Sequence, residues 1–171
     1  MKILFLDFDG VLNTGSYQNQ LRTHGNPDSD GFGELFDPEA VGNLKKILDA
    51  VPDVRVVVSS SWKLYGLDQM RLMWRERSLP GKLFDVTPDL PDDDLLAIDL
   101  SDITNLLRLE SIEKGREISA WIKRYGGRNC RYVILDDVAE FSGDLSGHHV
   151  RTNPDIGLSR EDALRAIAIL K

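Results

Sequence analysis

The chain has 171 residues, of which 42% are hydrophobic and 29% charged, and its formal net charge at pH 7 is −7. This balance is typical of one globular domain, expected over residues 1–171, and no apolar run approaches the ~20 residues that a membrane-spanning helix requires. The negative charge excludes a basic surface over the whole molecule but permits a local basic patch.

Two features concern the cellular compartment. Cys130 is the only cysteine, so no intrachain disulfide can form. Asp7 and Asp9 interrupt the only early apolar run, so the sequence shows no signal peptide. We therefore expect a protein of the reducing cytoplasm that has no membrane partner.

The most informative segment is residues 3–12, where the apolar run Ile-Leu-Phe-Leu precedes Asp7, Asp9 and Gly10. The run predicts a buried strand. Carboxylates are costly inside a sheet, so both acids are expected at the carboxyl end of the strand, where parallel sheets bind ligands. Two oxygen ligands this close suit Mg²⁺, and one of them can also act as a nucleophile that accepts a phosphoryl group. The alternative is a plain Asp-Gly turn with solvated acids.

The next elements alternate between helices and strands. Residues 13–36 are rich in Gly, Asn, Asp, Ser and Gln, which predicts a long loop or a small flap or lid. A helix is expected to begin at Pro38 with Asp37 as its N-cap. Residues 54–58 predict a second strand, and the spacing of apolar residues after position 67 predicts a second helix.

The middle of the chain is less regular. Residues 83–87 are ambiguous and can form a short strand, and the three aspartates at 92–94 predict a solvated acidic turn. Apolar residues at helical spacing predict a helix over 118–125. Residues 131–135 predict another buried strand, which ends in two acids.

The last elements complete the pattern. Residues 149–151 predict a short strand, and Ser159 with Asp162 resembles the N-cap pair of a final helix. The apolar stripe of that helix is expected to contain Leu164, Ile167, Ala168 and Leu170. Alternation of this kind predicts an α/β fold in three layers, with a parallel sheet between helices.

Polar residues follow three of the predicted strands. They are Asp7 with Asp9, the serines at 59–61, and Asp136 with Asp137. Because the ends of parallel strands open on one side of a sheet, we expect these three sets to converge there.

At this point the chain resembles the haloacid dehalogenase-like (HAD) superfamily, whose four motifs appear in order at residues 7–12, 56–59, 114–118 and 133–137. The Ser-Ser-Trp and Leu-Asp-Asp details, with Gly-Leu-Ser at 157–159, look most like the capless HAD domains associated with RNA-repair proteins. The resemblance implies a Rossmann-like parallel sheet with a small or absent cap.

The resemblance also implies catalytic roles. Asp7 would attack phosphorus and form an aspartyl-phosphate. Asp9 would protonate the leaving oxygen and then activate water. Ser59 would hydrogen-bond the transferring phosphoryl group, and Lys114, expected at the start of a helix, would offset the negative charge of Asp7 and phosphate.

The implied cofactor is Mg²⁺. Its ligands would be the Asp7 carboxylate, the Asp9 backbone carbonyl, and Asp136 or Asp137. Without the cation, several anions would crowd one pocket and oppose phosphate binding.

Alternatives stay open at two positions. Ser60 or Ser61 can take the place of Ser59, and Ser60 is also a candidate for substrate binding. Arg116 or Lys63 can take the place of Lys114. The other notable side chains are expected to be structural: Trp62, Trp74 and Trp121 in the core, Cys130 as a buried filler, and His24, His148 and His149 as structural or surface residues.

The function predicted from the sequence is Mg²⁺-dependent hydrolysis of a phosphomonoester, with a phosphorylated small molecule or nucleic-acid end as substrate. Hydrolysis at nucleic-acid ends in RNA or DNA repair is one alternative, although the net charge of −7 weighs against tight nucleic-acid binding. A catalytically idle binding module with the same fold is the other.

Overall fold

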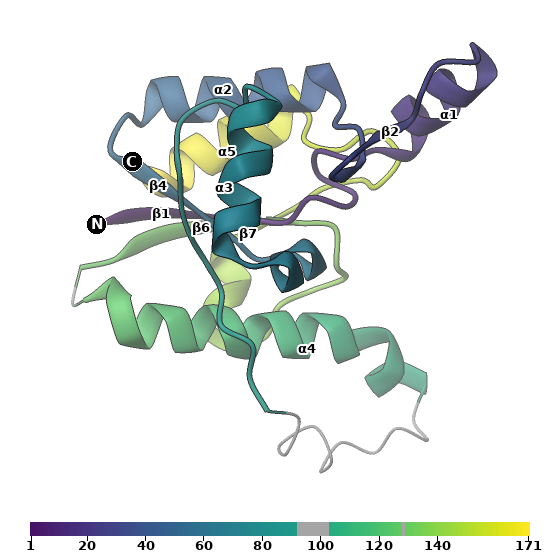
Figure 1. The fold of residues 1–171 in the computed structure, drawn as a ribbon. Helices are drawn as coiled ribbons and strands as arrows, with labels where there is room; N and C mark the ends of the chain where they lie inside the picture. Colours follow the sequence, from purple (N-terminus) through teal and green to yellow (C-terminus); the bar gives the residue numbers. More distant parts are fainter. Residues whose placement is uncertain (92–102, 128) are drawn as a thin grey trace.

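A parallel sheet of five strands forms the centre of the protein. The computed structural model describes residues 1–91, 103–127 and 129–171, so the acidic turn expected at 92–94 lies outside the described residues. The strand order is β5–β4–β1–β6–β7, and every pairing is parallel, as predicted (Figure 1). The strands are β1 Lys2–Leu6, β4 Val54–Val58, β5 Leu83–Val86, β6 Arg131–Asp136 and β7 His149–Arg151.

Helices cover both faces of this sheet, which confirms the three-layer architecture. One face carries α2 (Pro38–Ala50), α3 (Leu67–Glu76) and α5 (Arg160–Leu170), and the other carries α4 (Ile103–Trp121) (Figure 1). Asp37 caps α2, because its side chain accepts a hydrogen bond from the backbone of Glu39.

Alternation along β1 explains how one strand serves two cores. Leu4 and Leu6 belong to the core shared with α2, α3 and α5. Ile3 and Phe5 point to the other face and pack in the core that includes Trp121 of α4. The central part of a strand that is buried on both faces must be apolar. The strand therefore ends at Leu6, directly before the first acid, Asp7.

Residues 13–36, expected to be a long loop or a small flap or lid, contain more regular structure than a loop. They contain helix α1 (Gly15–Thr23) and a small antiparallel hairpin of β2 (Ser29–Asp30) and β3 (Gly33–Glu34). Thr14 caps α1 by accepting a hydrogen bond from the backbone N–H of Tyr17. The helix buries only Gln18 and Leu21, so it leaves no apolar periodicity in the sequence. The described residues include no cap domain, in agreement with the expected small or absent cap.

Two details of the later helices also differ from expectation. The described part of α4 begins at Ile103, so Lys114 lies within the helix rather than at its start, and a π-helical turn (Ile122–Gly126) follows. On α5 the buried residues are Ala163, Ala166 and Leu170, whereas Leu164 is 58% exposed. No helix among the described residues is long and apolar enough to cross a bilayer.

Candidate active site

The polar ends of three neighbouring strands meet at the carboxyl edge of the sheet, as the sequence predicts. Asp7 and Ser59 directly follow β1 and β4, and Asp136 is the last residue of β6. The parallel hydrogen-bond pattern extends past the strands: Asp7 N–H donates to the Leu135 carbonyl at 3.0 Å, and Ser59 N–H donates to the Leu6 carbonyl at 2.9 Å. These backbone bonds fix where the side chains emerge.

The turn after β1 requires glycine. Gly10 has φ of +69°, and a Cβ at this position would lie 2.4 Å from Oδ2 of Asp137. The turn is held from the other side by Thr152, whose hydroxyl donates to the Gly10 carbonyl at 2.8 Å. Glycine therefore allows Asp137 to approach the end of β1.

Three carboxylates and one ammonium group form the centre of the site. Asp7, Asp136 and Asp137 each offer an oxygen atom, and these oxygens all lie within 4.8 Å of one another. Nζ of Lys114 lies 2.6 Å from Oδ2 of Asp7 and 3.1 Å from Oδ2 of Asp136. Asp7 also accepts a hydrogen bond of 2.7 Å from the backbone N–H of Phe8.

Burial sets the electrostatics of this group. Asp7 and Asp136 are almost inaccessible to solvent. Burial raises the pKa of Asp7 and, with the negative charge of Asp7, raises the pKa of Asp136 to about 7. Burial also raises the pKa of Asp137. Burial opposes the charge on Lys114, but the charges of Asp136 and Asp7 outweigh it and raise the Lys114 pKa.

These residues fit a hard divalent cation. Lys114 faces the three carboxylates of this cluster and also that of Glu110, 3.0 Å from its Nζ, so negative charge is in excess. Among the described residues, the buried Oδ2 of Asp136 has no partner besides this ammonium group. Carboxylate oxygens are the ligands that Mg²⁺ takes in proteins, and a divalent charge would offset the excess of negative charge. Asp7, Asp136 and Asp137 could therefore hold Mg²⁺.

The Asp9 side chain lies outside the cluster of Asp7, Asp136 and Asp137. It is exposed, and it accepts hydrogen bonds from Nδ2 of Asn13 at 2.9 Å and from Nε1 of Trp62 at 3.1 Å. The same Asn13 amide donates to Glu34 at 2.6 Å. Both Asp9 carboxylate oxygens thus have fixed donors, which suits an orienting role for Asn13 and Trp62.

The three serines after β4 differ in burial and in hydrogen bonding. The Ser59 hydroxyl is buried and has no hydrogen-bond partner in the part of the chain that the structure describes, so it is a candidate to bind a ligand group. The Ser60 hydroxyl caps the short helix η1 (Ser61–Tyr65) by accepting from the backbone of Trp62, and it lowers the pKa of Asp7 against the stronger effect of burial. Ser61 is exposed.

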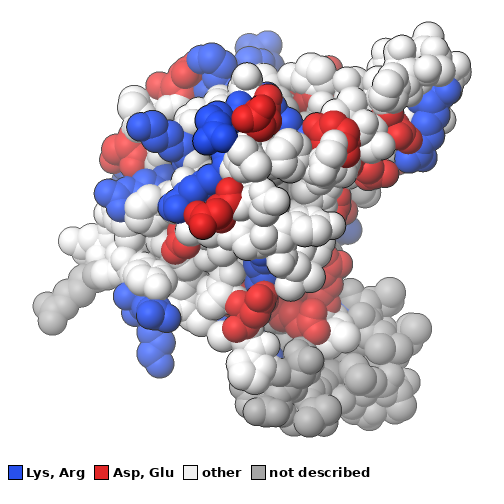
Figure 2. Space-filling model, viewed as in Figure 1, with Lys and Arg blue, Asp and Glu red and all other residues white. Residues whose placement is uncertain are grey.

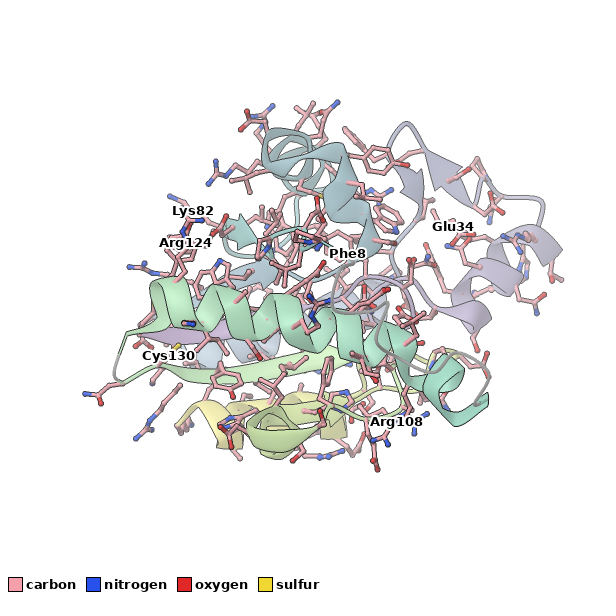
Figure 3. The ribbon with its side chains drawn as sticks, turned by 90° about the horizontal axis from the view of Figure 1, so that it is seen from below. Phe8, Glu34, Lys82, Arg108, Arg124 and Cys130 are labelled. Atoms are coloured by element: carbon pink, nitrogen blue, oxygen red, sulfur yellow. The ribbon has the colours of Figure 1, made fainter. Side chains whose placement is uncertain are left out.

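The hairpin in the segment after β1 forms one wall of the site. Trp62 packs edge-on against Phe8, with ring centroids 5.6 Å apart, and against Phe36 at the same distance. The ring of Trp62 also lies against Gly33, where a Cβ would be 2.9 Å from the indole. In Figure 3, Glu34 marks the segment that carries this hairpin, to the right of Phe8.

Arg77, at the end of α3, links the hairpin to this helix through hydrogen bonds. Its guanidinium donates to both oxygens of Asp30, at 2.7 and 3.0 Å, and to the Gly33 carbonyl at 3.1 Å. It also stacks over Phe36, 4.5 Å from the ring centroid. Sequence reasoning missed this group because Arg77 and Asp30 are far apart in the chain and neither belongs to a motif.

Trp62, Cys130 and Lys63 have surroundings that differ from those the sequence indicates. Trp74 and Trp121 are buried as expected, but Trp62 is only partly buried and reaches Asp9. Cys130 is half-buried rather than a fully buried filler. Lys63, an alternative to Lys114, instead pairs with Glu117 at 2.5 Å.

The remaining candidates also lie outside this site. Arg116 donates to the Pro91 carbonyl. The three histidines bond backbone carbonyls, as structural residues do: His24 that of Gln20, His148 that of Tyr132 and His149 that of Asp136.

A parallel three-layer fold with this acidic cluster after its central strand agrees with a HAD-like domain. The chain belongs to the family described as the HAD domain in Swiss Army Knife RNA repair proteins, whose sequence model matches residues 3–163. The family assigns the chain to the HAD-fold hydrolases. No curated protein and no solved structure matches the chain significantly.

Proposed function

We propose that the protein hydrolyses phosphomonoesters with Mg²⁺ and forms an aspartyl-phosphate on Asp7. The observation that carries this proposal is the contact between Asp7 and Lys114 beside Asp136 and Asp137. The ammonium group of Lys114 lies 2.6 Å from the buried Asp7 carboxylate. It can therefore offset the negative charge both of that carboxylate and of a phosphate that approaches it.

In the first half of the reaction, a carboxylate oxygen of Asp7 attacks phosphorus, and the bond to the leaving alcohol breaks. Asp9 donates a proton to that leaving oxygen. In the second half, Asp9 takes a proton from water, whose oxygen attacks the phosphorus of the aspartyl-phosphate. Inorganic phosphate leaves and the Asp7 carboxylate is restored. Asp7 and Asp9 thus take part in both displacements at phosphorus.

Other groups hold the phosphoryl oxygens. The Ser59 hydroxyl, which is buried and has no partner among the described residues, donates to one of them, and Lys114 balances their charge. Ser60 is the second serine of the substrate site in this proposal. Asp7, Asp136, Asp137 and the Asp9 backbone carbonyl would hold Mg²⁺, which supplies positive charge to the phosphoryl group as it transfers.

Residues 13–36 act in this proposal as a fixed flap beside the site. Arg77 ties the hairpin to α3, and Asn13 links Glu34 to Asp9. A Gln18 amide also donates to the Leu35 carbonyl at 2.8 Å. Bonds at several points of the segment favour a rigid wall over a lid that opens.

The test is a screen of aryl, alkyl, nucleotide and oligonucleotide phosphates, with Mg²⁺ and with a chelator. We expect phosphate release that depends on Mg²⁺ and disappears in the Asp7→Asn protein. Turnover in metal-free buffer, or turnover by the Asp7→Asn protein, would contradict the proposal. No turnover of any substrate, with phosphate ligands still bound, would favour the idle binding module.

A nucleic-acid end is the second candidate substrate, because the matched family is named for RNA repair proteins and no cap domain stands among the described residues. An open site admits large substrates. Higher kcat/KM on end-phosphorylated oligonucleotides than on nucleotides would support it. We also propose a cytoplasmic location, which rests on the single cysteine alone.

A further inference from the structure

A basic and aromatic surface lies at the amino end of β4 and β5, away from the candidate active site. We call it the β5 surface and define it by Lys45, Arg55, Arg71, Lys82, Phe84, Arg124 and Tyr125. Its centre is a groove of about 820 Å³ between α2, α3 and the two strands. In Figure 3, Lys82 and Arg124 lie at the end of the molecule opposite Glu34.

The charge of this groove contrasts with that of the chain. Its lining has four basic residues and one acidic residue, Asp49, whereas the whole protein carries −7. Lys and Arg are frequent on the left of the face in Figure 2, with several Asp and Glu among them. Among the described residues, neither Arg55 nor Lys82 pairs with a carboxylate. Both charges are therefore available to an anionic partner.

Exposed aromatic rings continue the groove. Phe84 is 39% exposed and Tyr125 is 48% exposed, and the buried ring of Trp121 joins them, with centroids 6.4 and 5.3 Å away. Arg55 lies 4.6 Å above the Phe84 ring, and Arg124 lies 5.1 Å from the Tyr125 ring. Cations interleaved with exposed rings offer contacts both to phosphates and to the faces of bases.

We propose that the β5 surface binds single-stranded nucleic acid. On this surface the aromatic rings can stack on bases, and the neighbouring Lys and Arg side chains can neutralise phosphates. A single strand of nucleic acid presents both kinds of group. An acidic peptide would use the cations but leave the exposed rings without partners. This inference names the substrate class of the active site, and in that respect it rests on the proposed function.

The position of the surface sets a length for the ligand. Arg55 and Ser59 are four residues apart on β4, which corresponds to about 13 Å along a strand. Because β4 lies inside the sheet, this length is a lower bound on the path over the surface between the two places. A phosphorylated mononucleotide should therefore gain nothing from the β5 surface, because it is too short to reach both places.

The experiment compares the native protein with the Arg55→Gln/Lys82→Gln variant. Fluorescence anisotropy measures binding of a labelled single-stranded RNA of about 12 nucleotides at about 50 mM salt, followed by a salt titration. We expect the variant to bind several-fold more weakly, with the slope of log K against log salt reduced by about 1.4, because two phosphate contacts are lost.

The control is Arg160→Gln/Arg165→Gln, which removes the same charge from α5, a helix on the same face of the sheet that packs over the opposite edge, against β6 and β7. It should bind RNA as the native protein does. A Phe84→Leu variant tests stacking and should weaken binding without a change in the salt slope. Equal weakening by both double variants, or no binding of RNA by the native protein, would overturn the proposal.

Two further measurements distinguish this proposal from the proposed function. Hydrolysis of an aryl phosphate should be unchanged in Arg55→Gln/Lys82→Gln, while KM for an end-phosphorylated oligonucleotide rises. If RNA binding depends on these residues but the protein has no phosphatase activity, the proposed function is refuted, whereas the proposal that the β5 surface binds RNA is supported. Equal competition by polyglutamate and unlabelled RNA would overturn the assignment to nucleic acid.

Discussion

Trp62 provides a specific test of how Asp9 is positioned. Its indole N–H donates to Oδ2 of Asp9 at 3.1 Å, and Asn13 holds the other oxygen. The Trp62→Phe substitution removes this donor and keeps an aromatic ring against Phe8 and Phe36. A hydrogen bond to a charged group contributes ~1.5–3 kcal/mol, and the exposure of Asp9 places the loss near the lower value. We therefore expect about a tenfold loss in the step that Asp9 assists.

The assay is single-turnover cleavage of an alkyl phosphate and an aryl phosphate. An alkoxide needs the proton from Asp9 more than an aryl oxide does, so the loss should be larger on the alkyl substrate. Trp74→Phe is the matched control, because Trp74 also packs near Phe8 but donates to the Pro80 carbonyl rather than to Asp9. Equal losses on both substrates, or equal losses in both variants, would refute the positioning role of Trp62.

Three other predictions concern the site and its wall. Asp7→Asn should abolish turnover while the circular dichroism spectrum stays native, because the amide fills the same space but is a poor nucleophile; residual native activity would contradict this. Asp137→Asn should raise the Mg²⁺ concentration needed for half-maximal activity, since a charged oxygen ligand is lost; an unchanged Mg²⁺ titration would remove Asp137 from the site. Arg77 holds the pKa of Asp30 below its usual value of 3.8, so this pair stabilises the fold above that pH and its contribution is lost as the pH falls. Asp30→Asn should therefore reduce thermal stability at neutral pH and change it little in acid, as measured by melting curves. An equal fall in melting temperature at neutral and at acid pH would contradict this link between the Asp30 pKa and stability.

The parts of the fold that sequence predicts best are those with a strong local pattern. The run before Asp7 is apolar throughout because β1 is central and buried on both faces. The convergence of Asp7, Ser59 and Asp136 followed from a general property of parallel sheets rather than from any contact between them. Local periodicity and topology were therefore sufficient to bring these three residues together, whereas Lys114 of α4 came from the family resemblance.

The parts that sequence reasoning missed depend on tertiary packing. On α5, Ala163 and Ala166 face the core because small side chains allow a helix to lie close to the sheet, and the larger Leu164 points to solvent. A hydrophobicity pattern favours the opposite choice. The hairpin wall depends on Arg77, whose partners are an acid and a backbone carbonyl in a distant segment. No spacing rule predicts such a pairing.

The covalent intermediate is the direct test of the central claim. The native protein is mixed with a radiolabelled phosphomonoester and Mg²⁺, quenched in acid within one turnover, and digested for mass spectrometry. We predict a phosphoryl group on the peptide that contains Asp7, attached to that carboxylate, and no protein-bound label in the Asp7→Asn variant. Complete release of phosphate with no labelled protein at any time, or label on Ser59 in place of Asp7, would contradict the account.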